Sequence, residues 1–160
     1  MNLSSDEIIE ILGLKPLPEE GGFYLRTYES QCTIQLERGL RNIGDHIYYL
    51  ITKDQFSHLH LLQCDEMWHF YAGDPIEMIL FDSESFDLIE IGNTNLRNHR
   101  PQQLVKANKW QGAKLKEGGS WALIGTNAFP AYSQNDFTLG KQEMFNHLPS
   151  DRLEIVQRYI

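Results

Sequence analysis

The sequence has few cysteines, few basic residues and no long apolar run. Two cysteines, Cys32 and Cys64, occur in 160 residues, and they form no Cys-x-x-Cys pair. The 14 lysines and arginines are outnumbered by 22 acidic residues, which gives a formal net charge of −8. Nucleic acids and anionic membrane surfaces attract basic proteins, so this charge argues against either partner. No apolar stretch approaches the roughly 20 residues that a membrane-spanning helix needs.

The first residues, MNLSSDEIIEI, carry acids instead of the basic start of a secretory signal. Two thiols in a chain without an export signal are expected to be reduced, so we predict a cytoplasmic protein. A disulfide between Cys32 and Cys64 is also compatible with the sequence. Cys64 lies beside Asp65, and because neighbouring carboxylates raise the pKa of a thiol, we interpret it as unreactive.

The length and the 41% hydrophobic content predict one globular domain over residues 1–160. Ser4 and Glu7 form a capping-box pattern before an apolar helical face, and Gly13 is a plausible stop. Near the other end, PSDRLEIVQRY (149–159) predicts a second helix with Ser150 as its cap. Between them, short segments with strand character recur: FYLRTY (23–28), HIYYLIT (46–52), FSHLHLL (56–62), MWHFYAG (67–73), IEMILFD (76–82), SFDLIEIG (85–92), QLVKA (103–107) and SWALIGT (120–126). This spacing predicts a mainly β sandwich or barrel with flanking helices.

The stretch FSHLHLLQCDEMWHFYAG (56–73) holds three histidines and two carboxylates within two predicted strands. Because strand side chains alternate between faces, His58 and His60 share one face, and Glu66 shares a face with Trp68 and Phe70. A hairpin between the two strands would bring the two imidazoles near the carboxylate of Glu66. Such a group suits a divalent transition metal, or it could transfer protons as an acid–base pair.

His69 falls on the strand face opposite Glu66, together with Met67 and Tyr71. We interpret it as a hydrogen-bonded structural histidine, or one that faces a second layer.

The spacing His58-x-His60, then Glu66, then six residues and Gly73 resembles the first motif of the cupin superfamily. Its members are jelly-roll barrels, also called double-stranded β-helices. Five residues separate His60 from Glu66, one more than the usual motif. The second motif normally supplies a further histidine for a metal, but the matching residues here, FPAYS (129–133), contain none.

One small family of cupin-like proteins of largely uncharacterised function is more similar still. The resemblance lies in EGGFYLRTY (20–28), IYYLI (47–51), DEMWHFYAGDP (65–75), the Trp110-Gln111 pair and GTNAFPAYSQNDF (125–137). It implies a cupin-type jelly roll with a pocket inside the barrel, and a homodimer. In that family we expect an arginine where this chain has Leu61, and the position of His58 varies. His60 and Glu66 are therefore the shared polar residues on the inward face.

The remaining candidate ligand-binding residues are aromatic or polar. Tyr48, Trp68, Phe70 and Trp110 could line a cavity together, although for any one of them ordinary core packing is the better interpretation. Arg26 could clamp a carboxylate or phosphate, or form a surface ion pair. Gln111 and Asp136 are included because of the resemblance alone.

We therefore predict a cupin-like protein that binds a small polar metabolite of sugar or keto-acid type in its barrel. In one hypothesis, His60 and Glu66 are the acid and base of a metal-independent isomerase or epimerase, with no cofactor. In the alternatives, the protein binds its ligand without catalysis, or it uses a divalent metal on His58, His60 and Glu66.

Overall fold

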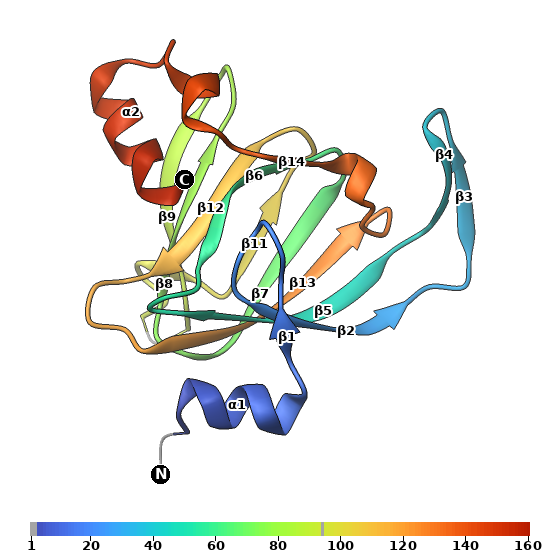
Figure 1. Ribbon diagram of the computed structural model, residues 1–160, viewed down its shortest axis with the longest axis horizontal. Coiled ribbons are helices and arrows are strands. Elements are labelled where there is room, and N and C mark those ends of the chain that lie inside the picture. Colours follow the sequence, from blue (N-terminus) through green and yellow to red (C-terminus); the bar gives the residue numbers. More distant parts are fainter. Residues whose placement is uncertain (1–2, 94) are drawn as a thin grey trace.

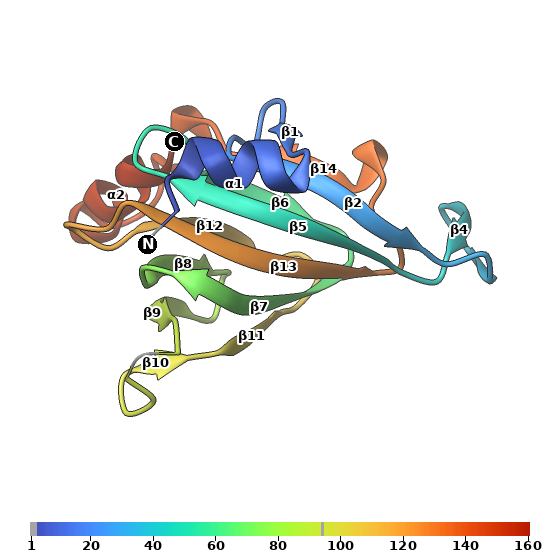
Figure 2. The same cartoon turned by 90° about the horizontal axis from the view of Figure 1, so that it is seen from below.

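The computed structural model describes residues 3–93 and 95–160, and its main feature is a pair of sheets that face each other (Figures 1 and 2). The first sheet has the order β1 (Lys15–Pro16), β2 (Phe23–Glu29), β5 (Asp45–Thr52), β13 (Trp121–Phe129), β7 (Asp65–Gly73) and β11 (Gln102–Val105). The second has the order β10 (His99–Arg100), β9 (Phe86–Ile91), β8 (Ile76–Phe81), β12 (Trp110–Leu115), β6 (Ser57–Leu62) and β14 (Phe137–Leu139). The mainly β fold that the sequence predicts is confirmed.

The main hydrophobic core fills the space between the two sheets. Along β7, Glu66, Trp68 and Phe70 are buried, whereas the residues between them are more exposed. This alternation is the period of two that a strand with one buried face requires. Tyr49 and Trp68 meet edge to face at 5.8 Å between ring centroids, a geometry that aromatic pairs favour.

Helical segments cover the outer faces of both sheets. Helix α1 (Ser5–Leu12) buries Ile8 against Leu50 of the first sheet. On the second sheet, η2 (Gln142–Phe145), α2 (Ser150–Val156) and η3 (Gln157–Tyr159) cover a cluster that includes Leu59 and Ile79. No helix among the described residues is both long enough and apolar enough to cross a bilayer.

The predicted helix ends are correct at α1 and wrong at α2. Ser4 and Glu7 form both bonds of the capping box, and Gly13 ends α1 with a left-handed φ of 65°. At α2 the N-cap is Pro149, with no side-chain capping bond. Ser150 is instead the first helical residue, because the chain turns from extended to helical geometry one residue earlier than predicted.

The predicted hairpin between the two histidine-containing strands is wrong. Strand β6 lies in the second sheet and β7 in the first, because the chain crosses between the sheets at residues 63–64. Instead of pairing with each other, β6 pairs with β12 and β14, and β7 pairs with β13 and β11. The faces of β6 and β7 that carry His60 and Glu66 therefore meet across the interior of the sandwich.

A two-stranded hairpin, β3 (Thr33–Leu36) and β4 (Gly39–Asn42), stands apart from both sheets (Figures 1 and 2). This hairpin is not among the strands that the sequence pattern predicts. Asp136 holds the turn and the second strand of this hairpin, since it pairs with Arg38 Nε at 3.1 Å and with an Arg41 nitrogen at 3.5 Å.

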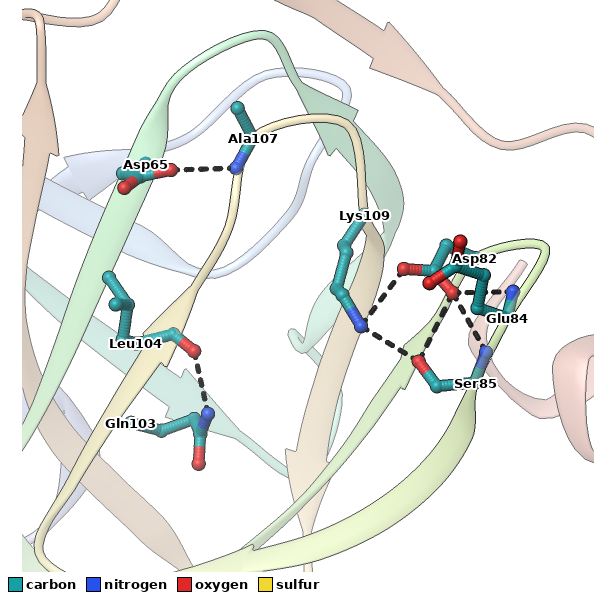
Figure 3. A network of polar contacts seen from close by, with 8 residues as sticks. All are labelled: Asp65, Asp82, Glu84, Ser85, Gln103, Leu104, Ala107 and Lys109. Atoms are coloured by element: carbon teal, nitrogen blue, oxygen red, sulfur yellow. Dashed lines mark hydrogen bonds and ion pairs between the residues drawn. The ribbon is translucent and has the colours of Figure 1, made fainter.

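A polar network ties the two sheets together where the chain passes from β11 to β12 (Figure 3). Asp65, at the start of β7, accepts a hydrogen bond from the Ala107 backbone N–H at 2.9 Å. Lys109 contacts Asp82 at 2.9 Å and Ser85 Oγ at 2.7 Å in the turn between β8 and β9. Lys106 and then the Ala107 N–H lower the pKa of Asp65, and Lys109 lowers the pKa of Asp82. The crossing loop is thus fixed to both sheets.

Residues 17–22, here called the strap, pack against β5 and β6. The Glu20 carbonyl accepts hydrogen bonds from the His58 backbone N–H at 2.7 Å and from His58 Nδ1 at 2.8 Å. The Tyr49 hydroxyl donates to the Gly21 carbonyl at 3.0 Å. Gly22 has a φ of 71°, and a Cβ there would lie 2.6 Å from the Tyr49 ring. Glycine therefore allows the strap to approach β5 this closely.

Gly22→Ala is expected to destabilise the protein more than Gly13→Ala. Both glycines have left-handed backbones, for which a side chain costs about 1–2 kcal/mol. A Cβ at Gly13 would meet nothing within 4 Å, so only Gly22→Ala adds an overpacking cost of about 1–3 kcal/mol. Urea unfolding of both variants measures the difference, and equal losses of stability would show that the strap does not pack tightly on Tyr49.

Candidate functional site

A cavity of about 100 Å³ lies on the inner face of the first sheet. Its walls come from β2, β5, β7 and β13, from the strap, and from Leu62 of the second sheet. Leu17, Ile47, Leu62 and Ala128 make part of the wall apolar. The other lining residues carry polar groups: Glu20, Tyr24, Arg26, Asp45, Tyr49, Glu66, Thr126 and Tyr132. Apolar walls with a few convergent polar groups are typical of small-molecule sites.

Glu66 is a buried carboxylate in this wall, with 8% of its surface exposed. Its Oε2 accepts a hydrogen bond from Trp68 Nε1 at 3.0 Å and one from Gln111 Nε2 at 2.8 Å. Burial raises the pKa of Glu66, and the nearby charge of Glu20 raises it further. His60 and the Gln111 bond oppose the shift. A carboxyl group with a raised pKa can both accept and release protons closer to neutral pH.

His60 lies behind the cavity wall. It is 1% exposed, and its Nδ1–H donates to the His58 carbonyl at 2.8 Å. Its ring stacks on Phe137 with 5.4 Å between centroids. His60 is the cross-strand neighbour of Gln111, so both point into the interior. The two predicted acid–base residues are therefore electrostatic neighbours, but only Glu66 lines the cavity.

Trp68 and Gln111 hold Glu66 in place. Gln111 Oε1 also accepts a bond from Trp68 Nε1 at 3.1 Å, so the three side chains form a closed triangle across the sandwich. Gln111 and Trp68 are almost fully buried. Of the candidate ligand-binding residues, these two support the site and do not form its wall.

The other predicted aromatic residues lie away from the cavity. Phe70 belongs to the main core between the sheets. Tyr48 lies on the outer face of the first sheet, where it meets Tyr71 edge to face at 6.2 Å. Trp110 packs on Phe145 beneath the C-terminal helical segments.

Arg26 lines the cavity, but its charge is already paired. It lies 3.3 Å from Asp45 Oδ2 and 3.5 Å from Glu29 Oε1. Asp45 is 4% exposed, and burial raises its pKa although Arg26 opposes the shift. Asp136 does not line the cavity, since it pairs with Arg38 and Arg41 in the turn and second strand of the β3–β4 hairpin.

The side chains proposed as metal ligands are arranged for other contacts. His58 turns its Nδ1 to the Glu20 carbonyl, and its ring packs on Phe56 at 4.4 Å between centroids. Glu66 is engaged by Trp68 and Gln111. Across residues 3–93 and 95–160, no group of three His, Cys, Asp or Glu side chains is placed to hold a metal ion. The residues as arranged do not fit that site.

The other residues discussed in the sequence, His69, Cys32 and Cys64, do not line the cavity. His69 Nε2 donates to Asn127 Oδ1, and Nδ1 accepts from Gln102 Nε2, both at 2.9 Å, on the outer face of the first sheet. Cys32 and Cys64 are both free thiols. Burial raises the pKa of Cys64 to about 12, so its thiol stays protonated at neutral pH.

Sequence reasoning missed Glu20, Asp45 and the tyrosines of the wall: Tyr24, Tyr49 and Tyr132. Glu20 lies in an irregular segment rich in proline and glycine, where no strand pattern indicates its direction. One signal was present, because Glu20 directly precedes the Gly21-Gly22 pair and such glycines mark close backbone approach.

Comparison with known proteins gives a consistent result. A family model described as cupin superfamily (DUF985) matches residues 6–140. A hypothetical protein from Leishmania major is 24% identical with a TM-score of 0.89, and the match covers 98% of both chains. A Shewanella oneidensis protein is 28% identical with a TM-score of 0.88, over 99% of this chain and 98% of that one.

A dTDP sugar isomerase from Desulfovibrio desulfuricans has a TM-score of 0.56 at 12% identity, over 79% of this chain and 89% of that one. This likeness concerns the fold alone. No curated protein matches the chain significantly. The cupin-type jelly roll predicted from the sequence is confirmed.

The raised pKa of Glu66 should make stability fall as pH rises. Because the folded protein retains this proton more tightly than the unfolded chain does, the stabilisation is complete below the ordinary pKa of 4.5 and is lost as pH rises through the folded value. Within that window one proton changes the free energy of unfolding by at most about 1.4 kcal/mol per pH unit.

Glu66→Gln cannot ionise and should flatten this part of the pH profile. Urea unfolding at several pH values between about 4 and 8 measures the slope for the wild type and the variant. Glu143→Gln, which changes an exposed glutamate outside the cavity, is the control. Parallel profiles for the wild type and Glu66→Gln would contradict a raised pKa at this position.

Proposed function

Because the chain belongs to the cupin superfamily, in the family described as DUF985, we propose that it binds a small polar metabolite of sugar or keto-acid type in the cavity between its sheets. The observation that carries the proposal is the buried carboxylate of Glu66, which lines the cavity and is oriented by Trp68 and Gln111. A buried and oriented carboxylate with a raised pKa is typical of a binding or catalytic group.

In the catalytic form of this proposal, the protein is a metal-independent isomerase or epimerase. Glu66 takes a proton from the bound metabolite and returns it at the same or a neighbouring atom, so the protein regains its starting state. His60 acts through Glu66, because it opposes the rise in the pKa of Glu66 while its ring stays behind the wall. His60 is therefore a positioning residue in this scheme.

A second candidate function is binding without catalysis. The observation in its favour is that His60 does not line the cavity, so Glu66 has no second predicted acid–base group in contact with a ligand. A proton-transfer enzyme normally needs such a group within hydrogen-bond reach of its substrate.

Thermal-shift measurements with a panel of neutral sugars, amino sugars, sugar acids and keto acids test the binding proposal. At least one member should raise the unfolding temperature, because a ligand that binds only the folded state stabilises it. Glu66→Gln should lose that shift, and Glu143→Gln should keep it. A panel without any hit, or a hit that Glu66→Gln leaves unchanged, would contradict the proposal.

Proton NMR of the bound metabolite in D₂O separates the two candidate functions. An isomerase or epimerase that works by proton transfer should exchange a carbon-bound proton of its substrate for deuterium, and Glu66→Gln should stop the exchange. If the protein only binds the metabolite, the metabolite should still raise its unfolding temperature. No carbon-bound proton of the metabolite should then exchange on long incubation.

We also propose that the protein is a homodimer whose contact includes the β3–β4 hairpin. An isolated two-stranded hairpin is marginally stable in water. This one leaves Ile34 and Leu40 exposed at its surface, Leu40 to 61%, and it projects away from the sandwich (Figures 1 and 2). A second copy of the chain would cover these apolar side chains.

Light scattering at low micromolar concentration should give the mass of two chains. Leu40→Glu should shift the protein towards the monomer, because a charge at a buried contact is costly. Leu96→Glu is the control, since Leu96 is also exposed but lies far from the hairpin in the loop after β9. A monomeric wild type would contradict the dimer.

A further inference from the structure

The cavity wall carries an excess of negative charge. Glu20, Asp45 and Glu66 supply three carboxyl groups, and Arg26 is the one lysine or arginine among the lining residues that the structure describes. Arg26 is already neutralised by Asp45 and, on its exposed side, by Glu29. Glu20 and Glu66 therefore have no lysine or arginine to pair with in the wall.

The hydrogen bonds to Glu20 and Glu66 come from neutral groups. Ser57 Oγ donates to Glu20 Oε1 at 3.0 Å, and Trp68 and Gln111 donate to Glu66. Such donors orient a carboxylate but do not cancel its charge. Removing an unpaired carboxylate from water costs free energy that a folded protein normally offsets with a partner of opposite charge. A bound cation would offset that cost.

Asp45 gives an independent indication of a missing donor. Its Oδ2 is buried, and although Arg26 lies 3.3 Å away, no hydrogen bond reaches this oxygen. Buried carboxylate oxygens normally accept a hydrogen bond. Since Asp45 lines the cavity, a ligand N–H group could supply it.

Aromatic rings complete the wall. Tyr24, Tyr49 and Tyr132 line the same cavity, and the faces of tyrosine rings attract ammonium groups. Burial raises the pKa of Tyr132 to about 12, so its hydroxyl stays neutral at neutral pH. Carboxylates beside tyrosine rings form a favourable site for a small organic cation.

We propose that the cavity selects an ammonium-bearing metabolite of amino-sugar type over an anionic sugar acid or keto acid, with Glu20 as the residue that determines this preference. The proposal rests on the proposed function, since it names the class of ligand for the same cavity. Glu20 is well placed for this role because the strap fixes its backbone to β6 through two hydrogen bonds to His58.

Three probes that share one ring and differ in charge test the proposal: glucosamine, glucose and glucuronate. Isothermal titration calorimetry of the full-length protein should give the order glucosamine, glucose, glucuronate, from tightest to weakest. The affinity for glucosamine should also be higher at about pH 7 than at about pH 5, because the raised pKa of Glu66 leaves its carboxyl group less ionised at the lower pH.

Glu20→Gln tests the role of the residue itself. The variant keeps an oxygen that can accept from Ser57 and removes the charge. It should therefore weaken the affinity for glucosamine by about tenfold and change the affinity for glucose by no more than about twofold. Glu19→Gln is the matched control, because Glu19 is the exposed neighbour on the strap and does not line the cavity. It should leave all three affinities unchanged.

Each other outcome overturns the proposal. Glucose or glucuronate binding as tightly as glucosamine would refute selection for a cation but leave the proposed binding function intact. A loss with Glu20→Gln that is equal for glucosamine and glucose would refute Glu20 as the charge-selecting residue. No binding of any of the three would refute this proposal and the sugar-binding form of the proposed function together.

Discussion

The burial of one carboxylate, Glu66, is the constraint on which the site depends. Glu66 from β7 meets Gln111 from β12 across the interior, and Trp68 closes the triangle between them. A buried carboxylate needs such donors. Without hydrogen bonds, its burial would cost far more free energy than the burial of an apolar residue. The same contact links the two sheets and aims the carboxylate at the cavity, so structure and proposed function share one interaction.

The strap supplies the part of the cavity wall that the two sheets lack. It closes the cavity over β2 and β5 and brings in Glu20, whose charge raises the pKa of Glu66. The two consecutive glycines allow its backbone to lie against Tyr49 and His58. The histidine that resembles a metal ligand in the sequence is thus used to fix a loop. Two carboxylates near each other in a partly apolar cavity then set the charge that a ligand must match.

Strand periodicity predicted the faces of His60, Glu66 and His69 correctly, because alternation is a local property of extended backbone. It could not predict which strands pair. The two-residue connection at 63–64 is as compatible with a hairpin as with a crossing between sheets, and only the packing of the whole sandwich decides. Glu20 and Asp45 were missed for a related reason: their directions depend on a loop and on a strand start, where periodicity carries no information.

A side-chain carboxyl ¹³C NMR titration of Glu66 tests the central claim most directly. We expect the Glu66 pKa to lie above its ordinary value of 4.5, and to move down towards that value in Glu20→Gln, since the Glu20 charge contributes to the shift. A Glu66 pKa at or below 4.5, or one that is unaffected by Glu20→Gln, would contradict a desolvated carboxylate that shares the cavity with a second negative charge.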